Sequence, residues 1–197
     1  MVNKVCVYCA SSDQAHPDYY AAARRLGELL AEDGIELVYG GGARGSMGAV
    51  ANGALSRGGR VTGILPKFMD DLEWGHPSIT DLQLVEDMHE RKHQMLTQSE
   101  AVVALPGGAG TFEELFEAIS FKKLALFLGP IILLNTRGFY DPCAALLEKS
   151  VTERFMGDVH NDIWTMVDTP EDVIPAIHAS PTWTESHREH AVVKPDE

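Results

Sequence analysis

The chain is poor in basic residues, and it lacks long apolar runs. Its 16 lysines and arginines stand against 29 aspartates and glutamates, which gives a formal net charge of −13. Because phosphate backbones select basic surfaces, this balance argues against nucleic acid as a main partner. No apolar run approaches the roughly 20 residues that a membrane-spanning helix needs. We therefore expect neither nucleic-acid nor membrane partners.

Cysteine is scarce, with three residues in the chain: Cys6, Cys9 and Cys143. A small, odd number is typical of a reducing compartment and not of a disulfide framework. The first residues lack a basic segment followed by an apolar one, so we expect no signal peptide and a cytoplasmic protein. Cys6 and Cys9 match a C-x-x-C redox motif, but they lie in a strand-like run, where residues three apart point to opposite faces. Buried thiols are the expected state.

The 197 residues alternate short apolar runs with helical patterns, which indicates buried parallel strands connected by helices. This order predicts an α/β fold with a doubly wound, Rossmann-like parallel sheet. We expect one domain over residues 1–179 and a loose, polar C-terminal tail over residues 180–197. The expected strands are residues 2–10, 35–39, 60–65, 101–105, 130–134 and 163–167, and the expected helices are residues 20–32, 47–57, 87–99, 112–124, a segment from Asp141, and 170–179. Residues 67–86 show no regular pattern, which is typical of a lid or a binding loop.

A glycine-rich stretch, residues 106–114, lies between an expected strand and an expected helix and reads Pro-Gly-Gly-Ala-Gly-Thr-Phe-Glu-Glu. Such a turn presents backbone N–H groups beside a helix N-terminus, which suits a phosphate. Thr111 and Glu114 also fit a capping box, with Thr111 as the N-cap. Three glycines in four residues favour a ligand loop, because a plain cap does not need them.

A second glycine loop contains Gly40, Gly42 and Gly45 in the G-x-G-x-x-G spacing of dinucleotide-binding folds. That fingerprint requires an acidic residue about 20 positions further on, to hold the ribose. Residues 43–69 contain no aspartate or glutamate, so we reject NAD binding and retain simple phosphate binding. A Walker A interpretation fails because the loop has no lysine followed by serine or threonine. Both glycine loops, and Ser11 after the first strand, should meet at the sheet edge where such folds bind ligands.

Residues 89–93 match the zinc-protease signature H-E-x-x-H, which places His89 and His93 on one face of a helix. A catalytic zinc needs a third protein ligand, for which the sequence offers no motif. Arg91 and Lys92 would also place two positive charges beside the metal. We therefore expect no metal site here.

Arg91 and Lys92 have two interpretations. They can be ordinary charges on a solvated helix face, or contacts for a phosphate or a leaving group, because their helix leads toward the first glycine loop. Glu73 lies beside Trp74 in the irregular stretch. It could hold a polar ligand edge, although the sequence alone favours an exposed loop acid.

Together these motifs resemble those of the LOG (Lonely Guy) family of cytokinin riboside 5′-monophosphate phosphoribohydrolases, which are often mislabelled lysine decarboxylases. Residues 106–114 match the family's P-G-G-x-G-T-x-x-E, and residues 39–48 match its second glycine loop. Residues 88–92 match M-H-x-R-K, and residues 9–12 resemble C-G-S-S with Ala10 in place of glycine. The pattern covers about the first 150 residues in order.

The resemblance implies that Arg91 and Glu114 are the catalytic pair. It also implies one set of residues that contacts the nucleotide and another that lines its phosphate end. The nucleotide set is Glu73, Lys92, Gly107, Gly108, Ala109, Gly110, Thr111, Phe112, Glu113 and Ser120. The phosphate set is Ser11, Gly41, Gly42 and Gly45. Ser120 stands where many members have threonine, which is a mild change. Phe121 stands where many plant members have tryptophan, which leaves the preferred base open.

The implied reaction is hydrolysis of the N-glycosidic bond of an adenosine 5′-monophosphate, with or without an N6 substituent. The products are the free base and ribose 5-phosphate, as in an AMP nucleosidase, and no cofactor is implied. Family members are usually homodimers or larger, with sites near subunit contacts. The alternative is a non-catalytic carrier of a nucleotide or of the molybdenum cofactor on the same fold. Arg91 and Glu114 favour the enzyme, because a carrier needs neither a base nor a cation at the leaving group.

Overall fold

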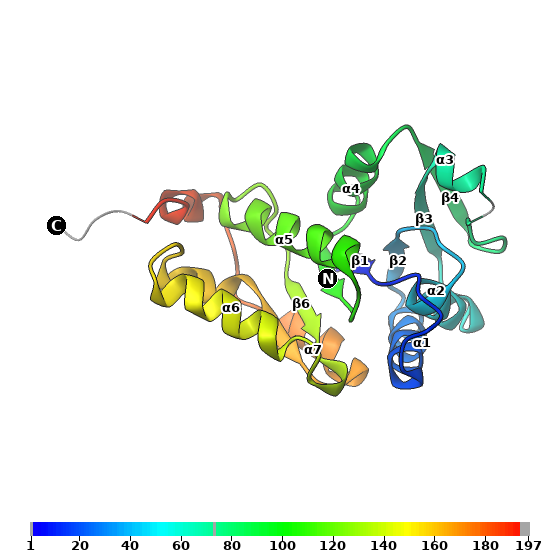
Figure 1. The fold of residues 1–197 in the computed structure, drawn as a ribbon, viewed down its shortest axis with the longest axis horizontal. Coiled ribbons are helices and arrows are strands. Elements are labelled where there is room, and N and C mark those ends of the chain that lie inside the picture. The colour runs from blue at the N-terminus through cyan, green and yellow to red at the C-terminus, as the bar shows by residue number, and fades with distance from the viewer. Residues whose placement is uncertain (1, 73, 194–197) are drawn as a thin grey trace.

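The structure is a computed structural model that describes residues 2–72 and 74–193. Within these residues, seven parallel strands form one sheet in the order β4-β3-β2-β1-β5-β6-β7 (Figure 1). The strands are β1 (Lys4–Tyr8), β2 (Glu36–Tyr39), β3 (Val61–Pro66), β4 (Asp81–Val85), β5 (Ala101–Ala104), β6 (Ile131–Leu134) and β7 (Thr165–Val167). The predicted α/β class and parallel sheet are confirmed.

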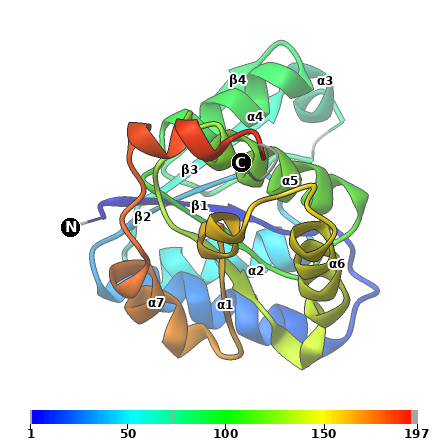
Figure 2. The same ribbon diagram turned by 90° about the vertical axis from the view of Figure 1, so that its left-hand side faces the viewer.

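Helices cover both faces of this sheet (Figures 1 and 2). The α-helices are α1 (Pro17–Glu32), α2 (Gly45–Ser56), α3 (Lys67–Asp70), α4 (Met88–Thr97), α5 (Ala109–Lys123), α6 (Asp141–Thr152) and α7 (Val173–Ala179). Short 3₁₀ helices are η1 (Thr136–Gly138), η2 (Asp158–Ile163), η3 (Pro170–Asp172) and η4 (Glu185–His190). None of the helices among the described residues is both long and apolar enough to cross a membrane.

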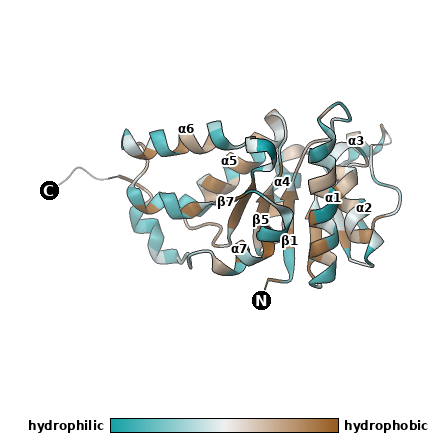
Figure 3. Cartoon of the chain, turned by 90° about the horizontal axis from the view of Figure 1, so that it is seen from below, coloured by the Kyte–Doolittle hydropathy of each residue, from teal (hydrophilic) through white to brown (hydrophobic). Residues whose placement is uncertain are grey.

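Two apolar cores lie on the two faces of the sheet. One core joins the sheet to α1, α2 and α7, and the other joins it to α4, α5 and α6. Figure 3 shows the apolar colour concentrated in the strands and on the inner sides of the helices. The alternation of β1 divides its residues between the cores, since successive side chains of a strand point to opposite faces. Cys9 therefore lies in the first core and Cys6 in the second, both buried and unpaired, which confirms the prediction of buried thiols.

The order of the strands reverses next to β1. The chain moves outward from β1 through β2 and β3 to β4, and then returns to place β5 on the other side of β1. The loops that follow β1 and β5 therefore leave the sheet side by side at its carboxyl edge. Open α/β sheets bind ligands in the crevice at such a switch point.

The prediction that residues 67–86 are irregular is wrong at both ends of that segment. Its first residues form α3, and its last form the edge strand β4. The sequence of β4 reads Asp-Leu-Gln-Leu-Val, and most of these residues are partly or fully exposed. A short edge strand of this kind lacks the continuous apolar run that marks a buried parallel strand, because only one side of it pairs with the sheet.

The prediction of a loose C-terminal tail is wrong for the residues that form η4 and for those just before it. Trp183 is 4 % exposed and packs against the core that includes α5. Lys122 Nζ lies 5.6 Å from the centre of the Trp183 ring, and burial lowers the pKa of Lys122 to about 8. Arg188 donates hydrogen bonds from Nε and Nη2 to the carbonyl oxygens of Leu124 and Ala125, just after α5. The tail therefore covers the C-terminal end of α5.

The helices α1 and α2 approach each other through two glycines. A Cβ atom added to Gly27 would lie 2.0 Å from the carbonyl oxygen of Val50, and one added to Gly53 would lie 2.0 Å from that of Arg24. These contacts are between backbones, so neither helix can move aside without shifting as a whole. Close packing of α1 and α2 therefore depends on the absence of two side chains.

We expect Gly27→Ala to destabilise the protein by about 1–3 kcal/mol, because it inserts a methyl group into a closely packed interface. Helix propensity alone predicts the opposite sign, since alanine is favoured over glycine in a helix by about 1 kcal/mol. The matched control is Gly110→Ala in α5, where an added Cβ meets nothing within 4 Å and stability should rise. Urea unfolding measures both changes, and a stabilised Gly27→Ala variant would contradict the packing argument.

Candidate functional site

A cavity of about 550 Å³ opens at the carboxyl edge of the sheet, at the switch point beside β1. Segments that are far apart in the sequence line it: the loops after β1 and β2, the end of β3, α3 together with Trp74, and the first turns of α2, α4 and α5. The predicted convergence of the two glycine loops and the first loop at one edge is therefore confirmed.

Arg91 enters the cavity from the first turn of α4. The helix begins at Asp87, whose Oδ1 accepts hydrogen bonds from the N–H groups of His89 and Glu90 at 2.8 and 2.9 Å. Asp87 is therefore the N-cap of α4. It fixes the start of the helix, so that Arg91, at 4 % exposure, points inward and the two histidines His89 and His93 point to solvent.

Three acceptors hold the guanidinium group of Arg91. Its Nη1 donates to Glu114 Oε1 at 2.8 Å, its Nε to the carbonyl oxygen of Ile64 at 3.1 Å, and its Nη2 to that of Gly40 at 3.4 Å. Removing an arginine from water is costly unless its N–H groups find acceptors. Here the ends of β3 and β2 supply backbone acceptors, and α5 supplies the counter-charge.

Glu114 is 4 % exposed and lines the same cavity. Burial raises the pKa of its carboxyl group, and the adjacent Arg91 opposes that shift without cancelling it. A carboxyl group with a raised pKa in a cavity is suited to acid–base chemistry near neutral pH.

The capping box proposed for Thr111 and Glu114 is wrong. The N-cap of α5 is Gly108, and the helix already begins at Ala109. Thr111 therefore lies inside the first turn, and Glu114 lies one turn further along, paired with Arg91 rather than with the start of its own helix. The sequence placed the start of the helix too late because glycines at its first positions resemble a loop.

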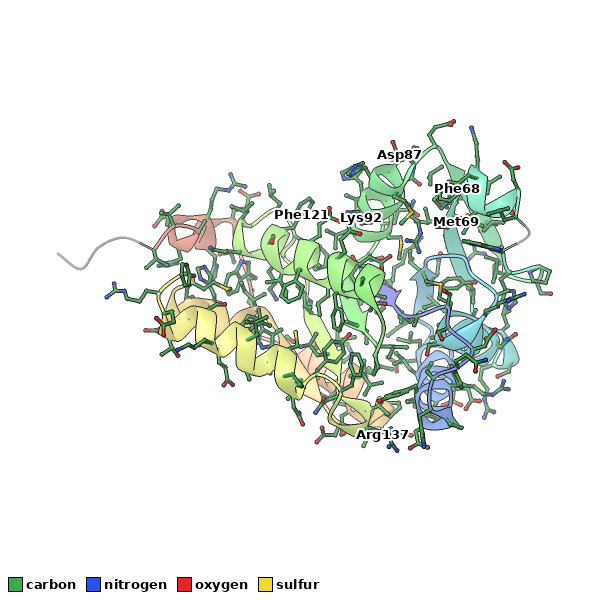
Figure 4. The ribbon with its side chains drawn as sticks, in the orientation of Figure 1. Phe68, Met69, Asp87, Lys92, Phe121 and Arg137 are labelled. Atoms are coloured by element: carbon green, nitrogen blue, oxygen red, sulfur yellow. The ribbon has the colours of Figure 1, made fainter. Side chains whose placement is uncertain are left out.

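Lys92 lies between α4 and α5, as Figure 4 shows. Its Nζ contacts Glu113 Oε1 at 2.6 Å and Glu117 Oε1 at 3.2 Å. Burial lowers the pKa of Lys92, but the hydrogen bonds to Glu113 and Glu117 outweigh it, so the pKa is raised. This side chain is a second electrostatic connection between the two helices, next to the pair of Arg91 and Glu114.

The N-terminus of α5 opens into the cavity at Gly108, Gly110 and Thr111. The first N–H groups of a helix have no acceptor within the helix, and they carry partial positive charge. Aromatic packing fixes this end: Phe112 stacks on Phe139 with ring centres 6.0 Å apart. Tyr140 supports the preceding loop, because its Oη donates to the carbonyl oxygen of Leu105 at 2.7 Å.

The N-terminus of α2 is arranged differently. The N–H of Gly45 donates to Asp13 Oδ1 at 2.8 Å, and the N–H of Met47 donates to the carbonyl oxygen of Ala10 at 3.1 Å. A carboxylate of the protein thus already occupies the position that an anion would take there. The second glycine loop shapes the cavity, while the N-terminus of α5 is the better anion site of the two.

The predicted site residues divide into two groups in the structure. Those that line the cavity are Ser11, Gly42, Arg91, Gly108, Gly110, Thr111, Glu113 and Glu114. Seven others do not line it: Gly41, Gly45, Lys92, Gly107, Ala109, Phe112 and Ser120. Ser120 is exposed further along α5, where its Oγ donates to the carbonyl oxygen of Phe116 at 2.7 Å. Glu73 lies outside the described residues.

Several other lining residues were not among the predicted site residues: Gly40, Arg44, Met47, Met69, Trp74 and Met88. Trp74 reaches the cavity because its carbonyl oxygen accepts from the N–H of Ala43 at 3.1 Å, and His76 donates to Gly41 at 2.9 Å. No sequence pattern reveals this pairing of two loops. In the part of the chain that the structure describes, no three or more His, Cys, Asp or Glu side chains gather where they could hold a metal ion.

The fold and the site together define a class: a Rossmann-like α/β protein whose ligand cavity lies at the switch point of its sheet and contains a helix N-terminus and a buried Arg–Glu pair. Solved structures share this fold. The molybdenum cofactor carrier protein of Chlamydomonas reinhardtii superposes with a TM-score of 0.70 over 90 % of this chain and 97 % of that chain, at 19 % identity. The molybdenum cofactor binding protein of Rippkaea orientalis gives 0.69 over 91 % and 97 %, at 24 % identity. At such identities the likeness concerns the fold alone.

Sequence comparison identifies the family within this class. A family model described as "Possible lysine decarboxylase" matches residues 47–177. The probable cytokinin riboside 5′-monophosphate phosphoribohydrolase LOGL1 of Oryza sativa subsp. japonica is 39 % identical over 95 % of this chain and 83 % of its own length. The phosphoribohydrolase LOG2 of Arabidopsis thaliana is 42 % identical over 78 % of this chain and 72 % of its own length. The chain belongs to the LOG family of cytokinin riboside 5′-monophosphate phosphoribohydrolases, as its motifs predicted.

We expect Tyr140→Phe to lower the free energy of unfolding by about 1–3 kcal/mol, because it leaves a buried carbonyl group without its donor. The control is Tyr20→Phe, which removes a half-buried hydroxyl that donates to the carbonyl oxygen of Ser12 at 3.0 Å and accepts from the N–H of Ala15 at 2.7 Å, near the surface where water can replace it. Denaturant unfolding of both variants measures the difference. Equal changes would contradict the proposed support of the loop before α5.

Proposed function

We propose that this chain hydrolyses the N-glycosidic bond of adenosine 5′-monophosphates, with or without an N6 substituent. The oxygen of water bonds to C1′ of the ribose, the bond from C1′ to the base nitrogen breaks, and the base leaves with a proton. The products are the free base and ribose 5-phosphate. The observation that carries the proposal is the buried pair of Arg91 and Glu114 inside a cavity that also contains a helix N-terminus.

In this proposal the 5′-phosphate lies at the N-terminus of α5. Gly108 and Gly110 allow close approach to the backbone, and the amides of the first turn supply hydrogen-bond donors. The net charge of −13 leaves few other places for an anion, so the local amides must provide most of its binding energy. A phosphate held there fixes the ribose relative to the reacting groups, which is how remote binding energy accelerates a reaction.

Glu114 and Arg91 act on the bond that breaks. Cleavage builds positive charge on the ribose and negative charge on the departing base. The carboxylate of Glu114 stabilises the first charge and accepts a proton from the attacking water, and the guanidinium of Arg91 stabilises the second. The ion pair that lines the cavity thus consists of the two groups that the transition state needs.

The proposal includes a homo-oligomer and a cytoplasmic location. Three leucines that follow α5 are 40–61 % exposed: Leu124, Leu126 and Leu128. Exposed apolar side chains that lie close together support packing against a partner. All three cysteines are free, which suits a reducing compartment. Light scattering coupled to size-exclusion chromatography tests the oligomeric state, and a monomer at all concentrations would contradict it.

We expect kcat/KM for AMP to fall at acid pH. Glu114 must be ionised, and its pKa is raised by burial, so protonation should remove activity as the pH falls through a value above the ordinary 4.5 of a glutamate. Glu114→Gln should lower turnover by roughly 10²–10⁴-fold, as is usual for a positioned acid or base, and should abolish this acid limb. AMP affinity should hold or increase, since a negative charge near the phosphate disappears. A Gln variant with the wild-type rate and acid limb would exclude the role of Glu114.

We expect a strong preference for 5′-monophosphates over nucleosides. Each hydrogen bond to a charged group contributes about 1.5–3 kcal/mol, so two such contacts to the phosphate correspond to roughly 10²-fold or more in kcat/KM. Chromatography of the base released from AMP, isopentenyladenosine monophosphate and adenosine measures this preference. Comparable rates for AMP and adenosine would contradict phosphate binding at α5. Tight AMP binding with no release of base from either nucleotide would instead support a carrier.

A further inference from the structure

The first glycine of the second loop, Gly40, lies directly against the guanidinium group of Arg91. A Cβ atom added to Gly40 would lie 1.8 Å from Arg91 Nη2 and 3.0 Å from its Cζ. The third near atom is the terminal methyl of Met47, at 3.2 Å. No side chain can therefore occupy this position while Arg91 keeps its place.

Backbone conformation does not explain this glycine. Gly41 and Gly45 in the same loop have φ angles of 78° and 58°, which favour glycine over other residues. Gly40 is not among the residues with positive φ. What the position requires is empty space, and the space is filled by the guanidinium group.

Hydrogen bonds restrain the guanidinium group of Arg91 against displacement. Its Nε and Nη1 are held by the carbonyl oxygen of Ile64 and by Glu114, at 3.1 and 2.8 Å. Gly40 itself supplies the third acceptor, its own carbonyl oxygen. A side chain at position 40 would push Nη2 away from that carbonyl and turn the whole planar group, because the three contacts share one rigid fork.

We propose that Gly40 is a positioning residue for Arg91: its missing side chain and its carbonyl oxygen together set where the guanidinium group faces Glu114 and the cavity. The expected loss of kcat/KM rests on the proposed function, whereas the positioning of Arg91 by Gly40 does not. A displacement of about 1 Å in a reacting group can cost roughly 10²-fold in rate. Gly40→Ala should therefore lower kcat/KM about 10²-fold while the affinity for AMP changes little.

The pH profile provides a second readout. The charged and titratable groups that face Glu114 are Arg91 and Lys92 from α4, Glu113 from α5, Cys6, Tyr8 and Cys9 from β1 and its end, and Tyr140 before α6. Only Arg91 is moved by a side chain at position 40. Moving this cation away removes the influence that lowers the pKa of Glu114, so the acid limb of kcat/KM should shift to higher pH in Gly40→Ala.

A double-mutant cycle in thermal stability tests the geometry without any substrate. Lysine lacks Nη2, so Arg91→Lys frees the space beside Gly40. Gly40→Ala should lower the Tm in the wild-type background and change it little, or raise it, in the Arg91→Lys background. The matched control is Gly157→Ala, where an added Cβ meets no atom closer than 3.8 Å and should change neither the Tm nor kcat/KM appreciably.

The outcomes are distinguishable. Equal losses of Tm in both backgrounds, or a Gly40→Ala enzyme with the wild-type kcat/KM and acid limb, would overturn the positioning role. If Gly40→Ala does not fold, recovery of folding in the double variant supports the proposal, and its failure overturns it. If the wild-type chain releases no base from any nucleotide, the proposed function fails, and the stability cycle still decides the geometric inference.

Discussion

The buried ion pair between Arg91 and Glu114 is the contact on which the rest of the site depends. Two charges removed from water cost several kcal/mol each unless they are paired and fully hydrogen-bonded. Here the cost is offset because the edges of two strands and a helix all contribute acceptors. The pair joins α4 to α5 across the carboxyl edge of the sheet. Both helices must therefore take one fixed orientation, and the cavity between them keeps its shape and its polarity.

The sheet makes that arrangement possible. Because the strand order reverses beside β1, the loop after β5 lies next to the loop after β1, and the N-terminus of α5 opens into the cavity there. The two glycine loops then serve different ends. The loop before α5 places a helix N-terminus at the cavity. In the loop before α2, the N–H of Gly45 donates to Asp13, and the carbonyl oxygen of Gly40 accepts from Arg91. A single motif type thus produces an anion site in one loop and a close backbone contact in the other.

Much of the fold could be predicted from the sequence, because buried parallel strands are apolar throughout and the glycine loops mark where they end. The edge strand β4 was not predicted, because its exposed residues interrupt the apolar run. The burial of Trp183 was not predicted either, because a single aromatic residue in a polar segment shows no periodicity. At the site, Arg91 and Glu114 were found through a motif. Their contact, the raised pKa of Glu114 and the position of the Arg91 guanidinium group against Gly40 depend on the three-dimensional fold. The pairing of Trp74 with the second glycine loop has no local signal at all.

The docked C-terminal segment extends the part of the chain that supports the helix of Glu114. Residues 183–190 lie beyond residue 177, where the match to the family model ends, yet Trp183 and Arg188 hold the far end of the helix that carries Glu114. A helix is stiff along its axis, so a displacement at its last turn is transmitted to its first. The contacts that support the helix of Glu114 therefore extend past the region that the family model matches.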